Sequence, residues 1–239
     1  MKEKRVLYVD IVSWHVRIHR MALIREAITK GYDVHVALPH AGREPALRAL
    51  GSSIHKVALS RKGMEPFQEG WSIGELARLY RRLRPRLVHH LTLKPVLYGT
   101  LAATAARVPA VLNAVTGLGY LFDDHGPAFR AAREVALRLL RPALRRKNVY
   151  FLFQNADDRA EFERRGLAAP ERTRLLPGSG VDVERFAPQP PPNGTPAVVL
   201  PARLLRPKGV LEFVQAARLL RREGVQARFI LAGSPDPGN

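Results

Sequence analysis

The sequence predicts an α/β protein built on a parallel β-sheet. Short apolar runs alternate along the chain with amphipathic helical segments, and the connections between them are short. Strands that alternate with helices in this way form parallel sheets covered on both faces, with right-handed crossovers. Ligands of such folds bind beyond the carboxyl ends of the strands, so the residues that follow each predicted strand are the candidate site residues.

The predicted strands are apolar runs bounded by turn residues. The first has little polarity on either side, as a buried strand requires, and the second is closed by Pro39. They span residues 6–12, 33–38, 54–59, 87–91, 110–115, 150–154 and 174–176, followed by 197–201 and 227–232.

The predicted helices are fixed by their start and stop signals. Gly31 and Gly51 stand where a left-handed residue ends a helix. Ser72 with Glu75 three residues later is a capping-box signature, and Asn155 is a good N-cap. The predicted helices span residues 18–30, 44–50, 72–84, 95–107, 129–146, 155–165 and 210–222.

A proline-rich stretch, residues 188–194, separates the last two strands from the rest of the chain. Such a stretch cannot continue a helix or a central strand. We therefore expect a first domain over residues 1–187, a linker over 188–196 and the start of a second domain over 197–239. A single βαβ unit leaves most of its apolar surface uncovered, so it needs more chain or must dock on the first domain.

The chain is strongly basic and has no cysteine. It carries 39 Lys and Arg against 21 Asp and Glu, a formal net charge of +18. Such a surface attracts nucleic acid, anionic lipid headgroups or phosphorylated substrates, although a general arginine bias gives the same charge. The absence of cysteine excludes disulfides, cysteine-bound zinc and thiol nucleophiles. We see no signal peptide and no run long enough to span a bilayer, so we expect a cytoplasmic protein.

The segment 200–210 carries the most specific pattern. A buried strand ends, a basic loop follows, and a helix is expected to start at Lys208 and Gly209. Free N–H groups and the dipole of a helix N-terminus favour an anion there. Arg203 can bind a phosphate with two parallel hydrogen bonds, and Lys208 adds a point charge. A diphosphate fits this loop; two surface cations near a turn are the alternative.

This segment resembles the diphosphate-binding loop of GT4-family glycosyltransferases. Residues 212–220 and 228–233 match the same family, and so does the hinge-like stretch 176–188. Residues 89–99 and 113–120 resemble the subgroup that builds bacterial surface polysaccharides and lipid-linked oligosaccharides.

The resemblance implies a two-domain fold of GT-B type. The first domain would bind a lipid-linked or polysaccharide acceptor, and the second would bind a nucleotide sugar. Transfer would retain the anomeric configuration. No metal or other cofactor is expected, because Arg203 and Lys208 would neutralise the leaving diphosphate, with Gly209 beside it.

The acceptor-side candidates follow the predicted strands. His19 and Arg20 resemble an acceptor-side pair of the subgroup, while Thr92 and Lys94 stand just past a strand, where Lys94 could meet an acceptor phosphate. His15 and His19 have the spacing of a helical metal pair, but no third ligand is apparent, so we expect no metal site. His89 and His90 are strand neighbours and should face opposite sides of the sheet.

For the other candidates, an ordinary structural explanation stays open beside the functional one. Thr116 and Gly117 open a glycine-containing loop that could approach a ligand closely or form an ordinary tight turn. Asp123 and Asp124 read as a solvated turn. The basic helix 129–146 could rest on an anionic membrane, or it could face the core and present a solvated arginine surface.

Two other functions stay open. The family has a Glu-x7-Glu signature further along its second domain, whereas this sequence ends at Asn239. A non-catalytic fragment that binds acceptor, or that needs a partner chain, is therefore one alternative. A basic nucleic-acid-binding module is the other, but no helix-turn-helix, zinc or RRM-type signature supports it, and we expect no nucleic acid partner.

Overall fold

The computed structural model describes residues 4–39, 44–60, 66–118, 122, 126–190 and 193–235. The chain forms two compact units, residues 1–180 and 181–239, each of which is described by itself. The described part of the expected linker, residues 188–196, contains no helix or strand.

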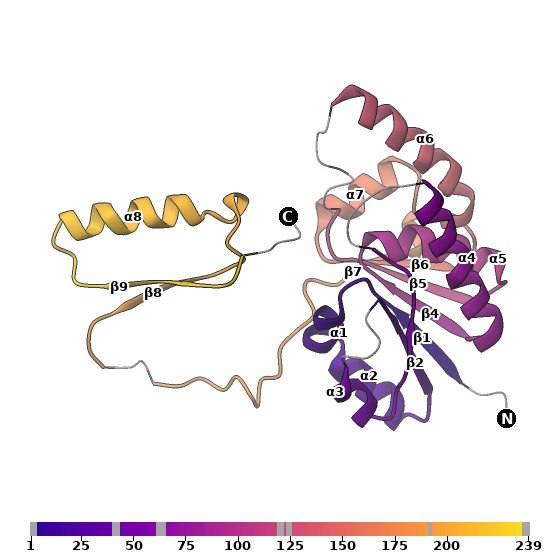
Figure 1. Cartoon of the computed structure of the whole chain (residues 1–239), viewed down its shortest axis with the longest axis horizontal. Coiled ribbons are helices and arrows are strands. Elements are labelled where there is room, and N and C mark those ends of the chain that lie inside the picture. The colour runs from indigo at the N-terminus through magenta and orange to yellow at the C-terminus, as the bar shows by residue number, and fades with distance from the viewer. Residues whose placement is uncertain are drawn as a thin grey trace. The chain divides into compact units, whose positions relative to one another are not determined.

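Unit 1 is built on a seven-stranded sheet in the order β3-β2-β1-β4-β5-β6-β7 (Figure 1). Every neighbouring pair is parallel, which confirms the predicted parallel sheet. The strands are β1 (Arg5–Val9), β2 (Asp33–Leu38), β3 (Ser53–Lys56), β4 (Leu87–Leu91), β5 (Ala110–Val115), β6 (Val149–Phe153) and β7 (Thr173–Leu175).

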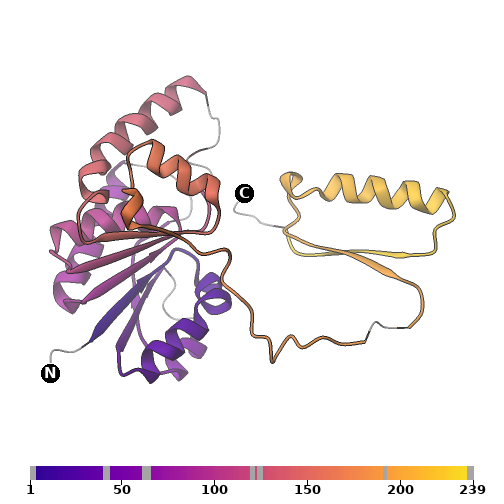
Figure 2. The same cartoon turned by 180° about the vertical axis from the view of Figure 1, so that it is seen from behind.

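Helices cover both faces of this sheet (Figures 1 and 2). One face carries α1 (Ser13–His19), α2 (Met21–Thr29) and α3 (Pro45–Ala49). The other carries α4 (Pro66–Leu83), α5 (Thr100–Ala105), α6 (Pro127–Leu144) and α7 (Ala156–Arg164). After β1 the chain adds strands toward β3, and after β4 it adds strands in the opposite direction, toward β7. Because crossovers of the same hand connect both series, the helices of the two series lie on opposite faces of the sheet.

Side-chain alternation along the strands divides the interior into two cores. In β1, Leu7 and Val9 belong to the core under α4 to α7, and Val6 and Tyr8 to the core under α1 to α3. Both sides of the strand are buried, which explains why the first predicted strand shows so little polarity.

The first predicted helix, residues 18–30, corresponds to the end of α1 and the whole of α2, and α1 itself begins earlier than predicted, at Ser13. The chain leaves helical geometry at Arg20, where φ is −128° and ψ is −4°. Arg20 still donates its N–H to the Val16 carbonyl and accepts from the Ile24 N–H, so the break costs little hydrogen bonding. Arg20 is therefore the C-cap of α1 and the N-cap of α2.

The capping-box prediction at Ser72 was wrong. The helix α4 begins at Pro66, so Ser72 lies inside it. Its hydroxyl donates to the Gln68 and Ala58 carbonyls, and the Glu75 carboxylate accepts from the Ala58 N–H. The same two polar side chains therefore tie the segment after β3 to α4 instead of starting the helix.

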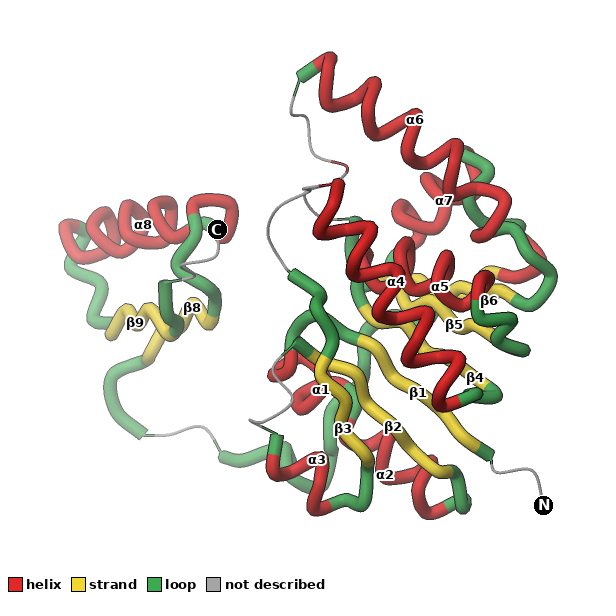
Figure 3. Tube along the Cα trace, turned by 45° about the vertical axis from the view of Figure 1, so that its right-hand side comes forward, coloured by secondary structure: helices red, strands yellow, loops and turns green. Residues whose placement is uncertain are grey.

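The predicted helix over residues 95–107 begins with a π-helical turn, η2 (Pro95–Gly99), before α5. In unit 2, β8 (Ala197–Pro201) pairs in parallel with β9 (Arg228–Ala232), and α8 (Val210–Arg222) connects them (Figure 3). A 3-10 turn, η5 (Arg206–Lys208), precedes α8.

The π-helical turn is packed directly on a buried histidine. The His90 ring accepts or donates hydrogen bonds at both nitrogens, to the Tyr80 hydroxyl (3.0 Å) and the Asn113 side chain (2.8 Å). A Cβ added at Gly99 would lie 2.3 Å from the Nε2 atom of this ring. No side chain can stand between Gly99 and His90 unless the network moves.

Replacing Gly99 by alanine is therefore expected to lower the free energy of unfolding by about 1–3 kcal/mol. Urea denaturation measures this change. Gly74→Ala is the matched control, because Gly74 lies in α4 with nothing within 4 Å of the added Cβ; this variant should stay within about 1 kcal/mol of the parent or gain stability. Equal effects of the two substitutions would contradict the close approach to His90.

Candidate functional site

The carboxyl ends of β1, β4 and β5 lie side by side, because these strands are neighbours in the sheet. The segments that follow them bring all the predicted acceptor-side residues to one edge of unit 1. These residues are His19 and Arg20 after β1, Thr92 and Lys94 after β4, and Thr116 and Gly117 after β5. Their placement follows the prediction, and their role stays a prediction.

A buried carboxylate, Asp10, organises this edge. Its side chain has no solvent exposure. One oxygen accepts from the N–H groups of Ile11 (2.7 Å) and Val12 (3.2 Å), and the other lies 2.7 Å from His15 Nδ1. Asp10 thus fixes the turn between β1 and α1. Asp10 was predicted as part of the first strand, residues 6–12, with no role of its own.

Thr92 joins the end of β4 to the same carboxylate. Its Oγ1 lies 3.4 Å from Asp10 Oδ1. Its φ of +69° is in the left-handed region, which is costly for a β-branched residue. Such backbone strain concentrates at binding and catalytic sites.

His19 ties the edge to the segment that follows β7. Its Nδ1 lies 2.8 Å from the Ser179 hydroxyl, and its ring centroid lies 4.9 Å from that of His15. Burial, followed by the charges of His15 and Arg20, lowers the pKa of His19 below its usual value. The neutral imidazole is therefore favoured, and it can exchange a proton or a hydrogen bond with a hydroxyl group.

Lys94 is already paired. Its ammonium lies 2.6 Å from the Glu69 carboxylate of α4, and the two side chains are 17% and 15% exposed. An acceptor phosphate that binds Lys94 must therefore share it with Glu69 or displace that carboxylate.

His89 and His90 face opposite sides of the sheet, as predicted. His89 lies beside Tyr8 on the α1–α3 side, with ring centroids 5.3 Å apart, whereas His90 bonds to Tyr80 of α4. Burial lowers the pKa of His89 to about 3, helped by the charge of Arg20, and burial lowers the pKa of His90 to about 4. Both imidazoles are neutral in the folded protein.

These two histidines make the stability depend on pH. Their pKa values are depressed on folding, so the unfolded chain binds more protons below about pH 6.5. The stabilisation is present above that pH and is lost as the pH falls from about 6.5 toward 4, by about 2 kcal/mol for each histidine between pH 7 and pH 5. Urea denaturation at the two pH values measures it. His89→Asn should reduce the difference by about 2 kcal/mol, whereas His90 and the part-buried His55, whose pKa burial lowers to about 4, keep their contributions. An unfolding free energy that is unchanged at pH 5 would contradict the assignment.

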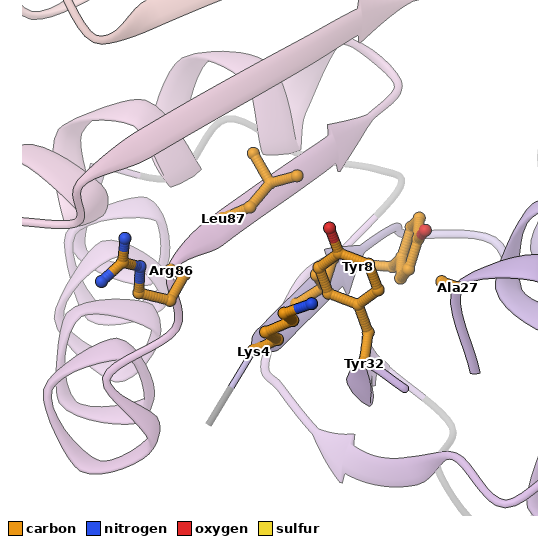
Figure 4. Close-up of a pocket in the computed structure, with 7 residues that line it drawn as sticks. Lys4, Tyr8, Ala27, Tyr32, Arg86 and Leu87 are labelled. Atoms are coloured by element: carbon orange, nitrogen blue, oxygen red, sulfur yellow. The ribbon is translucent and has the colours of Figure 1, made fainter. Parts of the chain in front are cut away.

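A groove of ≈ 560 Å³ lies at the other end of the strands (Figure 4). Tyr8, Tyr32 and Leu87 line it, with Lys4 and Arg86 at the amino ends of β1 and β4. It opens at these amino ends and reaches along the sheet as far as Tyr8, the fourth residue of β1.

In unit 2, the predicted phosphate loop follows β8. Arg203 lies two residues beyond the strand, between backbone hydrogen bonds from Ala202 to Ala232 (3.1 Å) and from Leu204 to Ser234 (3.2 Å). Both Arg203 and Lys208 are exposed. The loop is thus anchored to the end of β9 and presents both cations to solvent.

The predicted helix start at Lys208 and Gly209 needs correction. Lys208 ends a 3-10 turn, and Gly209 is the N-cap of α8 with a φ of +75°. The chain reverses at Gly209, which requires the left-handed conformation that glycine adopts freely. The cation therefore stands before the helix and not on its first turn.

The loop after β5 is described only in part. Thr116 and Gly117 are half-buried, and Gly117 has a φ of +148°. The other motif residues of this loop, Gly119 and Tyr120, and the acidic pair Asp123 and Asp124 lie outside the described residues.

The basic helix α6 faces the core. Leu137, Leu140 and Leu144 are buried against unit 1, and the opposite surface exposes Val135 and Leu139. Among the helices of the described ranges, none combines the length and the apolar character needed to cross a bilayer.

Comparison with known proteins agrees with this architecture. The chain is 26% identical over 230 residues to the N,N'-diacetylbacillosaminyl-diphospho-undecaprenol alpha-1,3-N-acetylgalactosaminyltransferase of Campylobacter jejuni; the alignment covers 91% of this chain and 60% of that relative. The chain thus spans less than two thirds of the relative's length.

Two solved structures share the fold. A glycosyltransferase from Rickettsia africae has a TM-score of 0.65 at 13% identity, covering 99% of this chain and 69% of that one. The Anabaena protein Alr3699/HepE, solved in complex with UDP and glucose, has a TM-score of 0.69 at 17% identity, covering 98% and 62%. The predicted α/β fold of GT-B type is confirmed.

A family match covers more than half of the sequence. The family described as glycosyl transferase 4-like matches residues 5–151, which run from β1 into β6 and include all six acceptor-side candidates. The resemblance inferred from the sequence motifs is thereby confirmed: the chain belongs to the glycosyl transferase 4-like family.

Proposed function

We propose that the protein transfers a sugar from a nucleotide-sugar donor to a lipid-linked or polysaccharide acceptor in the biosynthesis of cell-surface polysaccharide. Membership of the glycosyl transferase 4-like family carries this proposal. The Campylobacter relative supports the acceptor class, since its name describes transfer to a sugar on diphospho-undecaprenol.

The two units take different parts in the proposed reaction. The carboxyl edge of unit 1 binds the acceptor through His19, Arg20 and Thr92, and the loop of unit 2 binds the donor diphosphate through Arg203 and Lys208. That an Anabaena protein of this fold was solved with UDP and glucose supports a nucleotide-sugar donor.

In the transfer step, the acceptor oxygen forms a bond to the anomeric carbon of the sugar. The bond from that carbon to the diphosphate oxygen breaks, the electron pair leaves with the diphosphate, and the departing diphosphate takes up the proton of the acceptor hydroxyl. Arg203 and Lys208 stabilise the negative charge that develops on the leaving group, so the proposed mechanism needs no metal. We propose retention, with the acceptor attacking the face from which the diphosphate departs.

We place the protein in the cytoplasm, in peripheral contact with an anionic membrane that carries the acceptor. The outer surface of α6 suits this contact, because Val135 and Leu139 are 57% and 75% exposed beside the exposed Arg138 and Arg141. Sedimentation with phosphatidylglycerol vesicles tests it. The double variant Val135→Ser and Leu139→Ser should bind several-fold more weakly, and unchanged sedimentation would contradict a role of α6.

The function is tested by incubating the native protein with undecaprenyl-diphosphate-linked sugars and a set of nucleotide sugars. Mass spectrometry should show one acceptor that gains the mass of one hexose or N-acetylhexosamine, and NMR of that product gives the anomeric configuration. Binding of the acceptor with no gain in mass for any donor would favour the non-catalytic alternative.

A further inference from the structure

The groove at the amino ends of β1 and β4 has the size and the walls of a small-molecule site. Its volume of ≈ 560 Å³ falls within the range of about 300–1,000 Å³ that such sites occupy. Its apolar lining comes from Val6, Ala27 and Leu87, which belong to the core under α1 to α3 or pack against it. The rings of Tyr8 and Tyr32 complete the described walls (Figure 4).

The phenol of Tyr8 marks the inner end of this groove as incomplete. Tyr8 is 4% exposed, and its hydroxyl has no hydrogen-bond partner among the described residues. The ring of His89 lies beside it, with centroids 5.3 Å apart, and the Nε2 atom of His89 is also buried without a partner. Buried polar groups almost always have a partner, so an occupant of the groove should supply a hydrogen bond to Tyr8.

The rim of the groove is positively charged. Lys4 and Arg86 are both exposed, and neither forms an ion pair with a described residue. The Lys4 ammonium lies 5.6 Å from the centroid of the Tyr32 ring, whereas Arg86 lies on the side of Leu87 (Figure 4). Among the described lining residues, none is acidic. The rim therefore favours a ligand with a negative head group and disfavours a cation.

The two tyrosines favour a flat ligand over an alkyl chain. Aromatic rings that meet in offset-stacked or edge-to-face geometry gain more than the burial of their area alone. Tyr32 is 38% exposed, so part of its ring remains available for such a contact. Burial raises the pKa of Tyr8 to about 12, so its phenol stays neutral and can donate a hydrogen bond.

We propose that this groove binds a small aromatic anion. The acidic group lies beside Lys4, the ring system packs between the two tyrosines and Leu87, and an oxygen at the opposite end accepts a hydrogen bond from Tyr8. This site is separate from the proposed donor and acceptor sites. Its tests use neither a sugar donor nor an acceptor, so it stands or falls independently of the proposed function.

Matched probes test the chemistry by titration calorimetry of the native protein. The main probe is a hydroxynaphthoate with its carboxylate and hydroxyl at opposite ends of the ring system. Naphthoate lacks the hydroxyl, naphthol lacks the charge, and dodecanoate lacks the rings. We expect the hydroxynaphthoate to bind about threefold more tightly than naphthoate, as one added hydrogen bond gives, and more tightly than naphthol or dodecanoate.

The position of the site is tested by filling the groove. Ala27→Leu places a larger side chain in its wall and should weaken the hydroxynaphthoate by about tenfold or more, because a packed site does not admit the added volume. Ala22→Leu is the matched control, since Ala22 is exposed on the same helix and does not line the groove. Equal binding by the parent and Ala27→Leu, or an equal loss in Ala22→Leu, would overturn the site.

Two further variants assign the polar contacts. Tyr8→Phe should abolish the preference for hydroxynaphthoate over naphthoate without weakening naphthoate itself. Lys4→Gln should weaken both naphthoates by about threefold and leave naphthol unchanged, whereas Lys147→Gln, which removes an exposed charge elsewhere, should change none of them. A hydroxyl preference that survives in Tyr8→Phe would overturn the role of Tyr8.

A readout of stability guards against misfolded variants. The hydroxynaphthoate should raise the Tm of the parent and of Ala22→Leu, and it should leave the Tm of Ala27→Leu unchanged, since a ligand stabilises only the fold that binds it. Naphthol binding as tightly as naphthoate would overturn the assignment to an anion, and dodecanoate binding as tightly would overturn the assignment to an aromatic ligand. Absence of heat and of any Tm shift with every probe would mean that the groove holds only water.

Discussion

Replacing Lys208 by alanine in the native protein is expected to lower kcat by at least ~100-fold, since a preorganised positive group that stabilises a leaving diphosphate contributes that much to the rate. Lys208 is exposed at the end of η5, just before the reversal at Gly209, so the substitution removes charge without leaving a cavity. Steady-state kinetics with saturating donor measure the effect.

Arg222→Ala is the control for this experiment. Arg222 is an exposed cation at the far end of α8, and its removal changes the net charge of unit 2 by the same amount. Its kcat should stay within about twofold of the parent, because screening makes distant surface charges nearly independent. A Lys208→Ala variant that turns over as fast as Arg222→Ala would remove Lys208 from the mechanism.

Replacing Asp10 by alanine is expected to lower the free energy of unfolding by about 2–4 kcal/mol, because buried N–H donors lose their acceptor. The carboxylate accepts from Ile11 and Val12 and holds His15. The substitution should also reduce sugar transfer, since the turn that carries His19 loses its anchor. Urea denaturation gives the first effect and kinetics the second.

Asp10→Asn separates the hydrogen bonds that this side chain accepts from the backbone from the charge that it places beside His15. The amide oxygen can still accept from the two backbone N–H groups, so Asp10→Asn should recover more than half of the stability lost in the alanine variant. The charge that Asp10 places beside His15 is absent in both variants. Equal destabilisation by alanine and asparagine would contradict the role assigned to the backbone contacts.

The parallel sheet could be predicted because its evidence is local. The central strands β4 and β5 are buried on both faces, so each is a short apolar run, and their limits match the predicted 87–91 and 110–115. The N-cap at Asn155 was also found, because its side chain accepts from the Asp158 N–H within the same turn.

The errors in the fold arise where tertiary contacts override a local signal. Ser72 and Glu75 have capping-box spacing, but their partner is Ala58, on a segment that no local pattern can place. The sequence has no glycine or proline next to Arg20 that would predict the helix break there. The non-helical dihedrals at Arg20 therefore could not be predicted from the residues around it.

The candidate site was predictable in position but not in detail. Thr92 and Lys94 were found because they follow a strand, and parallel strands end at one edge. Asp10 was missed because it directly follows the apolar run of β1 and was read as part of it. Its role appears only when the turn folds back and offers it two N–H groups and a histidine.

The most direct test of the account is the stoichiometry of one reaction. Nucleoside diphosphate released and lipid-linked acceptor consumed are measured together, with the native protein, a nucleotide sugar and an undecaprenyl-diphosphate-linked sugar. The proposed reaction releases one nucleoside diphosphate for each acceptor extended, and this release should depend on the acceptor. Release of nucleoside diphosphate at the same rate without acceptor, or consumption of donor with no extended lipid, would contradict it.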